Sequence, residues 1–454
     1  MFSPTRFAIA VALVVIASVA RAADAPLDWK AGVASTVITP TEFIWMAGYA
    51  GRTTPAVART QDLFAKALVL QDADGKKQLL VTLDLIGVPR TLRDNLEKRL
   101  GAKHGLPREG LLINASHTHC GPEFRVAQKA SHLADVTQKE QAEAYGVFLE
   151  EKLVALAADA FAQLAPARLE YHHARCGFAM NRRLPVEGGY KNAPYSEGPV
   201  DHDVPVLAVF GADAKLRAAV FGYACHSTTM GFNEWCGDYP GYAQEYFQAD
   251  HPGATALFVA GCGGDQNPYP RRHLPLAQIH GRSLATAVRA ALEAPAVQLP
   301  ARLDAAMEDV QLDFAVPTRV EFESRLKGPD KYFASHAQRM LTRLDAGEAL
   351  PTHYAYPVQV VRFGGKLTLI ALGGEVVVDY SLRFKRELAG QHVWVAGYSN
   401  DVMAYIPSLR VLKEGGYEAG DANRYGNLPG PWTASVEERI AGKVHELLAR
   451  TQSK

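Results

Sequence analysis

Two histidines that directly follow an apolar segment are the residues of this chain best suited to bind a metal ion. His117 and His119 lie in the segment SHTHCGP, residues 116–122, after a predicted strand over residues 110–115. In an extended segment, residues two apart project to the same side. The two imidazoles could bind one cation together, or one could bind it while the other transfers protons. A hydrogen-bonded structural histidine pair is the alternative.

A third histidine and a carboxylate also follow predicted strands. His226 comes after the strand over residues 218–224, and Glu375 comes after the strand over residues 367–372 through two glycines. Zinc takes three or four N, O or S ligands, and an acid at the end of an apolar strand is costly unless it is paired. A loop histidine and a helix-start carboxylate are the alternatives. Tyr405 lies in a last cluster, residues 398–407, that follows another predicted strand, and the tyrosines of this cluster could simply be packing residues.

The elements that must position these residues alternate along the chain. Apolar periodicity predicts strands separated by helices, and this alternation predicts an α/β fold with a mixed β-sheet core and flanking helices. Residues 315–352 are more charged and predict a helical insertion, and no repeat or linker divides the chain. The expected strands cover residues 67–71, 79–85, 110–115, 204–210, 218–224, 254–260, 358–363, 367–372 and 393–397, and the expected helices cover 91–104, 138–164 and 436–448.

The first residues have the pattern of an export signal. Arg6 precedes an apolar run over residues 7–19, and small residues at 20–22 offer a cleavage site. The run is shorter than the roughly 20 residues that span a bilayer, so residues 1–22 are predicted to be a cleaved signal peptide and residues 23–454 a secreted or periplasmic domain without a transmembrane anchor.

The charges of the predicted mature chain are nearly balanced. Without Arg6 and Arg21, it has 46 basic and 48 acidic side chains. This balance gives no electrostatic reason to expect a nucleic acid partner.

The cysteines are five in number, so in an oxidising compartment at least one must stay free or pair between chains. None has the spacing of a zinc motif. We expect most to be small buried thiols, with a disulfide beside the histidine motifs as the alternative.

In the order of its motifs, the chain resembles the neutral, non-lysosomal ceramidases over nearly all of the predicted mature sequence. The segments AGVASTVITP, residues 31–40, and MAGY, residues 46–49, are similar to the amino-terminal signature of that family, and SHTHCGP is similar to its THTHSGP segment. Asp84 in the segment LDL also fits. The resemblance implies one zinc ion and a set of site residues. The implied zinc ligands are His117, His226, Glu375 and Tyr405, with His119 exchanging protons and the pairs Asn181-Arg182 and Tyr417-Glu418 holding the scissile carbonyl.

The chemistry expected of this set is amide hydrolysis by a metal-activated water. Zinc lowers the pKa of water toward neutrality, while Arg182 and Tyr417 would stabilise the developing oxyanion. We therefore expect a zinc-dependent hydrolase that cleaves an N-acyl lipid such as ceramide, with transient contact with a membrane surface. An amidase or esterase acting on another substrate, and a non-catalytic metal-binding protein on the same scaffold, are the alternatives. A further hypothesis is a structural Ca²⁺ or Mg²⁺ ion near Asp238 or Asp265. The alternative is that both acids are helix-capping or solvated groups.

The chain departs from the ceramidase pattern at two places. Asn267, in GDQNP at residues 264–268, stands where the family has a serine in a GDVSPN-like segment, implied to contact the sphingoid alcohol. Asn267 is therefore the predicted substrate-binding residue, but its larger planar amide changes the expected headgroup contact. The chain also ends soon after the Tyr417 region, which predicts a catalytic domain without the carboxy-terminal β-sandwich domain of those enzymes.

Overall fold

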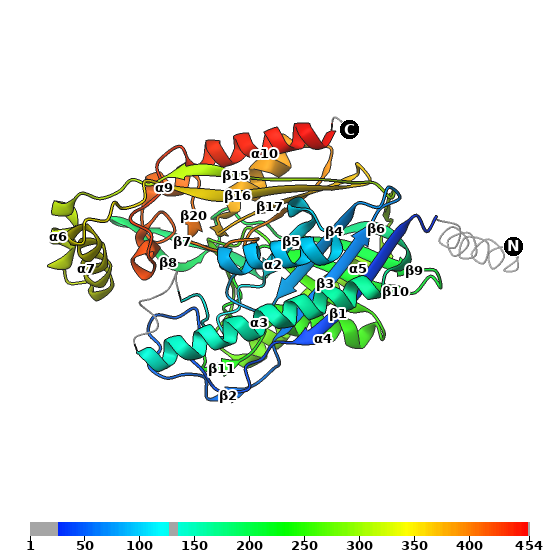
Figure 1. Cartoon of the computed structure of the whole chain (residues 1–454), viewed down its shortest axis with the longest axis horizontal. Coiled ribbons are helices and arrows are strands. Elements are labelled where there is room, and N and C mark those ends of the chain that lie inside the picture. The colour runs from blue at the N-terminus through cyan, green and yellow to red at the C-terminus, as the bar shows by residue number, and fades with distance from the viewer. Residues whose placement is uncertain (1–25, 127–134, 453–454) are drawn as a thin grey trace, which may run out of the picture.

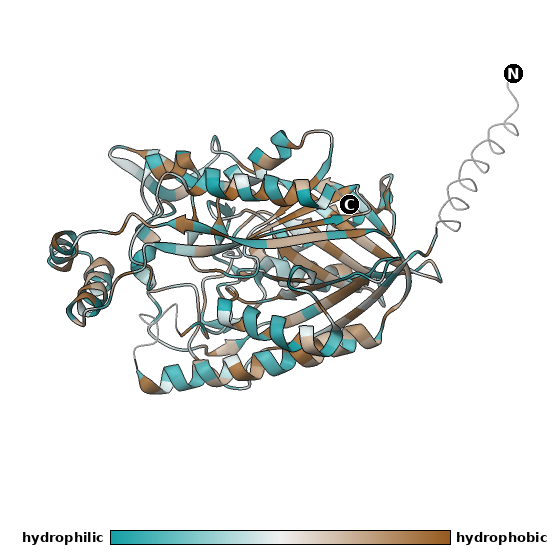
Figure 2. Cartoon of the chain, turned by 45° about the horizontal axis from the view of Figure 1, so that its top comes forward, coloured by the Kyte–Doolittle hydropathy of each residue, from teal (hydrophilic) through white to brown (hydrophobic). Residues whose placement is uncertain are grey.

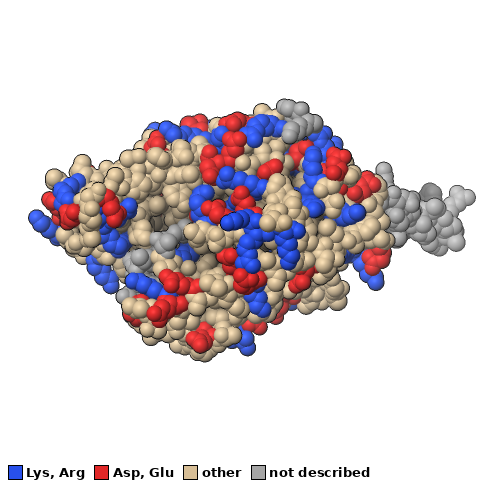
Figure 3. Space-filling model, viewed as in Figure 1, with Lys and Arg blue, Asp and Glu red and all other residues tan. Residues whose placement is uncertain are grey.

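A computed structural model describes residues 26–126 and 135–452, arranged as helices outside two facing β-sheets (Figure 1). The predicted signal peptide lies outside these described residues. Among the helices that are described, none combines the length and the apolar character needed to cross a bilayer. Acidic and basic side chains are interspersed over the face shown in Figure 3.

The larger sheet has nine strands and is mixed, as predicted. Strands β4 and β5 run parallel, as do β10 and β12, and the other neighbours are antiparallel. The strand order is β12-β10-β9-β6-β1-β3-β4-β5, with β14 also paired to β6. The bounds are β1 Trp29–Val37, β3 Phe64–Gln71, β4 Lys77–Leu83, β5 Leu111–Ala115, β6 Ala165–Arg175, β9 Asp203–Gly211, β10 Leu216–Tyr223, β12 Thr255–Ala260 and β14 Val297–Leu299.

A second sheet packs against the first, and the sequence analysis did not predict it as a separate layer. It contains, in order, β15 (Leu303–Asp313), β16 (His353–Phe363), β17 (Leu367–Leu372) and β19 (His392–Ala396). Leu68 and Val220 of the large sheet belong to one apolar cluster with Phe363, Leu369 and Trp394 of the second sheet. Alternation within a strand shows which faces are apolar, but it does not show which sheet the strand joins.

Helices cover the outer faces of both sheets, and their apolar residues turn inward (Figures 1 and 2). In α10, for example, Ile440, Val444 and Leu447 are buried at helical spacing. The helices α2 (Arg90–His104), α3 (Val136–Ala162), α4 (Asp238–Asp250) and α5 (Leu274–Glu293) pack on the large sheet, and α8 (Val378–Glu387) and α10 (Val436–Gln452) pack on the second sheet.

Two helices project from one end of the molecule, within the segment that predicts a helical insertion. They are α6 (Arg319–Leu326) and α7 (Lys331–Asp345), and they share a small apolar cluster of their own (Figure 1). The Tyr332 hydroxyl at the start of α7 donates a hydrogen bond to the Ala50 carbonyl at 3.2 Å. This contact joins the insertion to the loop after β1.

Short strands at the ends of the main sheets bring distant segments together. The bounds are β7 Ala179–Val186, β8 Gly189–Tyr195 and β13 Gln266–Pro268 in one small sheet, β18 Glu375–Val376 and β20 Tyr405–Ile406 in another, and β2 Ala58–Arg59 and β11 Glu234–Trp235 in a third. Helix α9 (Leu409–Glu414), the 3-10 turn at Arg108–Gly110 and a second such turn at Asp421–Tyr425 complete the described elements.

All five cysteines are buried and free, which confirms the prediction of buried thiols.

Candidate active site

The histidine segment leaves β5 through a tight turn, so the extended conformation predicted for it is wrong. His117 has a φ of 60°, in the left-handed region that non-glycine residues rarely adopt. Its backbone N–H donates to the Leu85 carbonyl at 3.0 Å, which holds the turn against the end of the neighbouring strand β4. The rings of His117 and His119 still meet, with 3.3 Å between their Nε2 atoms. The convergence comes from the turn and not from strand alternation.

His117 and His226 are oriented by backbone carbonyls. The Nδ1 of His117 lies 2.6 Å from the Ile86 carbonyl oxygen, and the Nδ1 of His226 lies 2.6 Å from that of Gly263. Because a carbonyl oxygen only accepts, each Nδ1 must carry the proton, and each Nε2 must present a lone pair. Burial and the neighbouring Arg182 lower the pKa of His226 to about 3, which favours this neutral form.

A carboxylate oxygen faces these two lone pairs. The Oε2 of Glu375 lies 3.1 Å from Nε2 of His117 and 3.2 Å from Nε2 of His226. This Oε2 is buried, and no donor among the described residues satisfies it. Three acceptors without a shared proton fit a cation between them. Tetrahedral zinc with ligands at about 2.05 Å would hold its ligand atoms about 3.3 Å apart, which is close to these separations.

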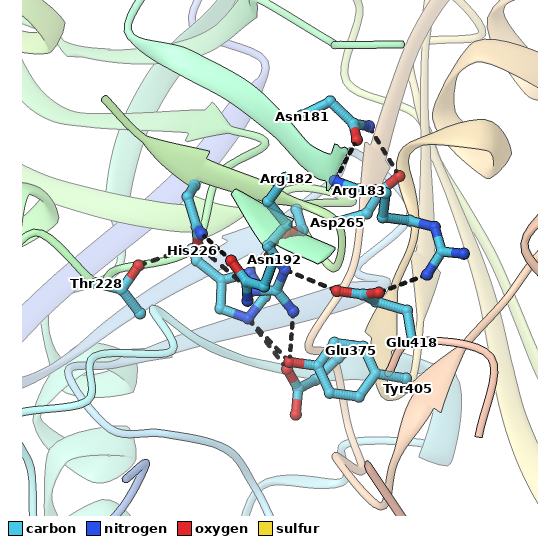
Figure 4. Close-up of polar contacts among 12 residues, drawn as sticks. Asn181, Arg182, Arg183, Asn192, His226, Thr228, Asp265, Glu375, Tyr405 and Glu418 are labelled. Atoms are coloured by element: carbon cyan, nitrogen blue, oxygen red, sulfur yellow. Dashed lines mark hydrogen bonds and ion pairs between the residues drawn. The ribbon is translucent and has the colours of Figure 1, made fainter. Parts of the chain in front are cut away.

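Tyr405 lies on the same centre because strands β18 and β20 pair Glu375 with Tyr405 in register. Its hydroxyl lies 3.2 Å from Nε2 of His226 and accepts a hydrogen bond from Nη2 of Arg182 at 2.9 Å. The structure therefore brings together all four residues named as zinc ligands, His117, His226, Glu375 and Tyr405, and Figure 4 shows three of them beside Arg182.

His119 completes a group of three imidazoles. Ligand atoms of His117, His119 and His226 all lie within 4.8 Å of one another, so His119 is placed either to bind the cation or to exchange protons beside it. Burial and the other two histidines lower the pKa of His119 well below its usual value. Its ring packs on Tyr49, with 4.7 Å between ring centroids, and its Nδ1 lacks a hydrogen-bond partner among the described residues.

Arg182 belongs to a buried charge cluster next to the histidines. Glu418 accepts from Nε of Arg182 at 2.8 Å and from Nη1 of Arg183 at 2.6 Å (Figure 4). Tyr417 places its ring 5.4 Å from that of Tyr405, and burial raises the pKa of Tyr417 above its usual value. A protonated phenol and a guanidinium are both hydrogen-bond donors, as the predicted stabilisation of an oxyanion requires.

The two predicted asparagines have different surroundings. Asn181 uses its amide away from the histidines: its Nδ2 donates to Asp265 at 3.1 Å, and its Oδ1 accepts from the Arg183 backbone. Asn267 lies closer, because its Oδ1 accepts from Nη1 of Arg182 at 3.3 Å and from Thr228 at 3.2 Å, while its Nδ2 donates to Asn192. Both sides of the Asn267 amide are thus engaged by protein atoms.

A cavity of about 420 Å³ opens beside the histidines. It is bordered by five predicted site residues and by apolar and aromatic side chains of the insertion and neighbouring loops. A larger cavity, about 830 Å³, lies near Lys76, Leu303 and Arg450 and is bordered by none of the predicted residues. The smaller cavity is therefore the candidate substrate pocket. Its site residues are His117, His119, Glu375, Tyr405 and Tyr417.

Three site features were missed by the sequence analysis. Tyr49, noted there only as part of a family signature, supports His119, and Arg183 shares Glu418 with Arg182. Arg125 borders the cavity and makes two bonds to the buried Glu123. Two sequence signals were available, the adjacent arginines at 182 and 183 and the Glu-x-Arg spacing after the histidine motif. Neither signal shows which residues these arginines contact in the folded chain.

The acids considered for a structural cation accept hydrogen bonds from protein donors. Asp238 accepts from the backbone N–H groups of Met230 and Tyr239, and Asp265 accepts from Val378 N–H and from Asn181. These contacts are those of capping and bridging carboxylates, so the hypothesis of a Ca²⁺ or Mg²⁺ ion gains no support from them.

Comparison with known proteins gives a consistent result. The sequence model of the family described as "Neutral/alkaline non-lysosomal ceramidase, N-terminal" matches residues 29–266. The fold is similar to that of neutral ceramidase from Pseudomonas aeruginosa, with a TM-score of 0.69, 21% identity and coverage of 89% of this chain and 72% of that one. A structure titled "Ceramidase complexed with C2" is similar at a TM-score of 0.69 and 20% identity, over 89% and 73%. No curated protein matches the sequence.

Proposed function

Because this chain belongs to the neutral/alkaline non-lysosomal ceramidase family, we propose that it is a zinc-dependent hydrolase that cleaves the amide of an N-acyl lipid such as ceramide. The observation that carries the proposal is the convergence of three proton-free acceptors, Nε2 of His117, Nε2 of His226 and Oε2 of Glu375. Two imidazoles, a carboxylate and a tyrosine oxygen are suited to one zinc ion, because zinc prefers N and O ligands in a small coordination shell.

Each remaining residue has a role that its contacts support. Bound zinc would supply Lewis acidity and lower the pKa of a nearby water. Arg182, held by Glu418 on one side, directs a guanidinium N–H toward Tyr405, beside the same centre. Together with the Tyr417 phenol it would donate to the carbonyl oxygen as negative charge develops there. His119, a neutral imidazole next to His117, would carry a proton to the departing nitrogen.

The surroundings of the site support an apolar acyl group. Ile86, Met403 and Leu428 border the cavity together with aromatic side chains, and pockets that bind apolar groups have this composition. We further propose that the protein acts outside the cytoplasm, as a secreted or periplasmic enzyme, because residues 1–22 have the pattern of a cleaved export signal.

The decisive experiment measures hydrolysis of a fluorescent N-acylsphingosine together with the bound metal. His117→Ala should remove both, whereas His445→Ala provides a matched control, because His445 is exposed on α10 and pairs with Glu387. Cleavage that is sensitive to a chelator and is lost only in His117→Ala would support the proposal. Wild-type protein that holds no stoichiometric metal would contradict it, and so would cleavage that survives His117→Ala.

A further inference from the structure

Two consecutive arginines lie in the loop after β13, beyond the residues that surround the histidines. Arg271 is half-buried and Arg272 is exposed. Arg271 donates from Nη1 to the Thr228 hydroxyl at 3.2 Å, and Arg272 donates from Nη1 to the Tyr49 hydroxyl at 3.0 Å. Their side chains therefore reach two residues that are themselves in contact with the site.

Short polar contacts connect these arginines to the candidate active site. The Thr228 hydroxyl that accepts from Arg271 also contacts Oδ1 of Asn267 at 3.2 Å, and this same oxygen accepts from Arg182 at 3.3 Å. On the other side, the ring of Tyr49 packs on the ring of His119. Arg271 is thus connected to the predicted oxyanion donor, Arg182, through two residues, and Arg272 to the predicted proton carrier, His119, through one.

Neither guanidinium has a carboxylate partner. In the described part of the chain no acidic oxygen lies within 4.0 Å of Arg271 or Arg272, although many other arginines here are paired. Burial and the neighbouring Arg272 lower the pKa of Arg271, as expected of a cation that lacks a counter-charge. The guanidinium matches a carboxylate through two parallel N–H···O bonds, so this pair of arginines is suited to bind an anionic group.

The position of the pair selects one side of the substrate. Arg271 and Arg272 do not border the cavity whose lining suits the acyl chain. An acyl chain in that cavity leaves only the amine part of the substrate to reach them. The Oδ1 of Asn267 already accepts from Arg182 and Thr228, so only the second N–H of its Nδ2, beside Asn192, is left for a neutral alcohol.

We propose that Arg271 and Arg272 bind a carboxylate on the amine part of the substrate, and that among N-acyl lipids the protein cleaves N-acyl amino acids in preference to neutral N-acyl amino alcohols such as ceramide. This inference rests on the proposed amide hydrolysis and specifies its substrate class. Water would add its oxygen to the acyl carbon, the C–N bond would break, and the departing nitrogen would take a proton, giving a fatty acid and a free amino acid.

The test uses two substrates that differ only in charge. N-Dodecanoylserine and N-dodecanoylserinol share the acyl chain and the amide, but a carboxylate in the first is a hydroxymethyl group in the second. The full-length protein should cleave the serine compound with the higher kcat/KM. Arg271→Gln and Arg272→Gln should each lower this value on the order of 10- to 100-fold, the loss expected for a charged hydrogen bond, and should leave the serinol compound nearly unaffected.

Control variants separate this inference from the proposed function. Arg271→Lys should restore part of the preference by returning the charge, and Arg289→Gln, on the exposed face of α5, should not change it. Equal loss for both substrates, or a wild-type preference for the serinol compound, would overturn the inference. If neither compound is cleaved, hydrolysis of the fluorescent N-acylsphingosine decides the hydrolase proposal separately. The charge inference is then decided by calorimetric binding: tighter binding of the serine compound that is lost in Arg271→Gln supports it, and equal binding overturns it.

Discussion

Glu375 and Glu418 carry carboxylates only a few side chains apart, yet their surroundings differ completely. Glu418 is buried and accepts from two guanidinium groups, those of Arg182 and Arg183, so its charge is matched within the protein. The Oε2 of Glu375 faces the unprotonated Nε2 atoms of His117 and His226, because the proton of each ring is on Nδ1 and is donated to a backbone carbonyl. Buried charges must be paired or must coordinate a metal. The first carboxylate is therefore structural on its own, and the second requires a cation to complete its surroundings.

The largest effect should come from the carboxylate that needs the cation. Glu375→Gln keeps the size of the side chain but removes the charge that faces His117 and His226, so we expect zinc to be lost and amide hydrolysis to fall about 10⁴-fold, equivalent to about 5.5 kcal/mol. A chelator should lower the Tm of the wild type, since a ligand at 1,000 times its Kd stabilises by about 4 kcal/mol. The variant should show no chelator effect. A variant that retains stoichiometric zinc would remove Glu375 from the ligand set.

The matched carboxylate should give the opposite result, a loss of stability without direct loss of the metal ligands. Glu418→Gln leaves the buried guanidinium of Arg182 without its carboxylate partner, whereas Arg183 keeps Glu414 at 3.1 Å. Breaking a buried ion pair costs about 3–5 kcal/mol. Denaturant unfolding of the metal-free protein measures this cost. Glu446→Gln on the exposed face of α10 is the control, where about 0–1 kcal/mol is expected. Equal losses of unfolding free energy in the two variants would show that the buried ion pairs of Glu418 contribute no more to stability than an exposed pair.

A third buried carboxylate extends the comparison to pH. Burial alone would raise the pKa of Glu170, but hydrogen bonds from His172, Gln298 and Arg168 lower it to about 2. Because the folded pKa lies below the usual 4.5, the contribution to stability is complete above about pH 4.5 and is lost as the pH falls toward about 2. A fall of the pKa from 4.5 to about 2 corresponds to about 3 kcal/mol at most. Unfolding free energies measured from pH 6 to pH 2.5 should fall less steeply in Glu170→Gln; identical slopes would argue against this carboxylate as the source.

The contrast between these carboxylates also explains what the sequence could reveal. Local periodicity predicted most of the central strands and the mixed sheet. The position of His117, His226 and Glu375 after strand ends made them candidate ligands, and the family resemblance implied that they bind one zinc ion. The left-handed turn at His117 and the second sheet were not predicted, because both depend on contacts between distant segments. For the same reason, the pairing of Glu418 with Arg182 and Arg183, separated by more than 230 residues, has no local signature.

The smallest expected effect concerns His119. The geometry is compatible with two roles for this residue, binding the cation or transferring protons. Gly48 has a φ of 97°, and a Cβ at this position would lie 2.4 Å from Nδ1 of His119. Gly48→Ala must therefore displace that ring or the backbone around residue 48, and the three nearest atoms to the added Cβ all belong to His119, not to His117, His226 or Glu375. We expect hydrolysis to fall about 10-fold or somewhat more, equivalent to about 1.4 kcal/mol, with zinc content unchanged. A fall in activity with full zinc assigns His119 to proton transfer, because a displaced ligand would weaken the metal as well. Loss of zinc in parallel with activity would instead make His119 a ligand beside His117, His226, Glu375 and Tyr405.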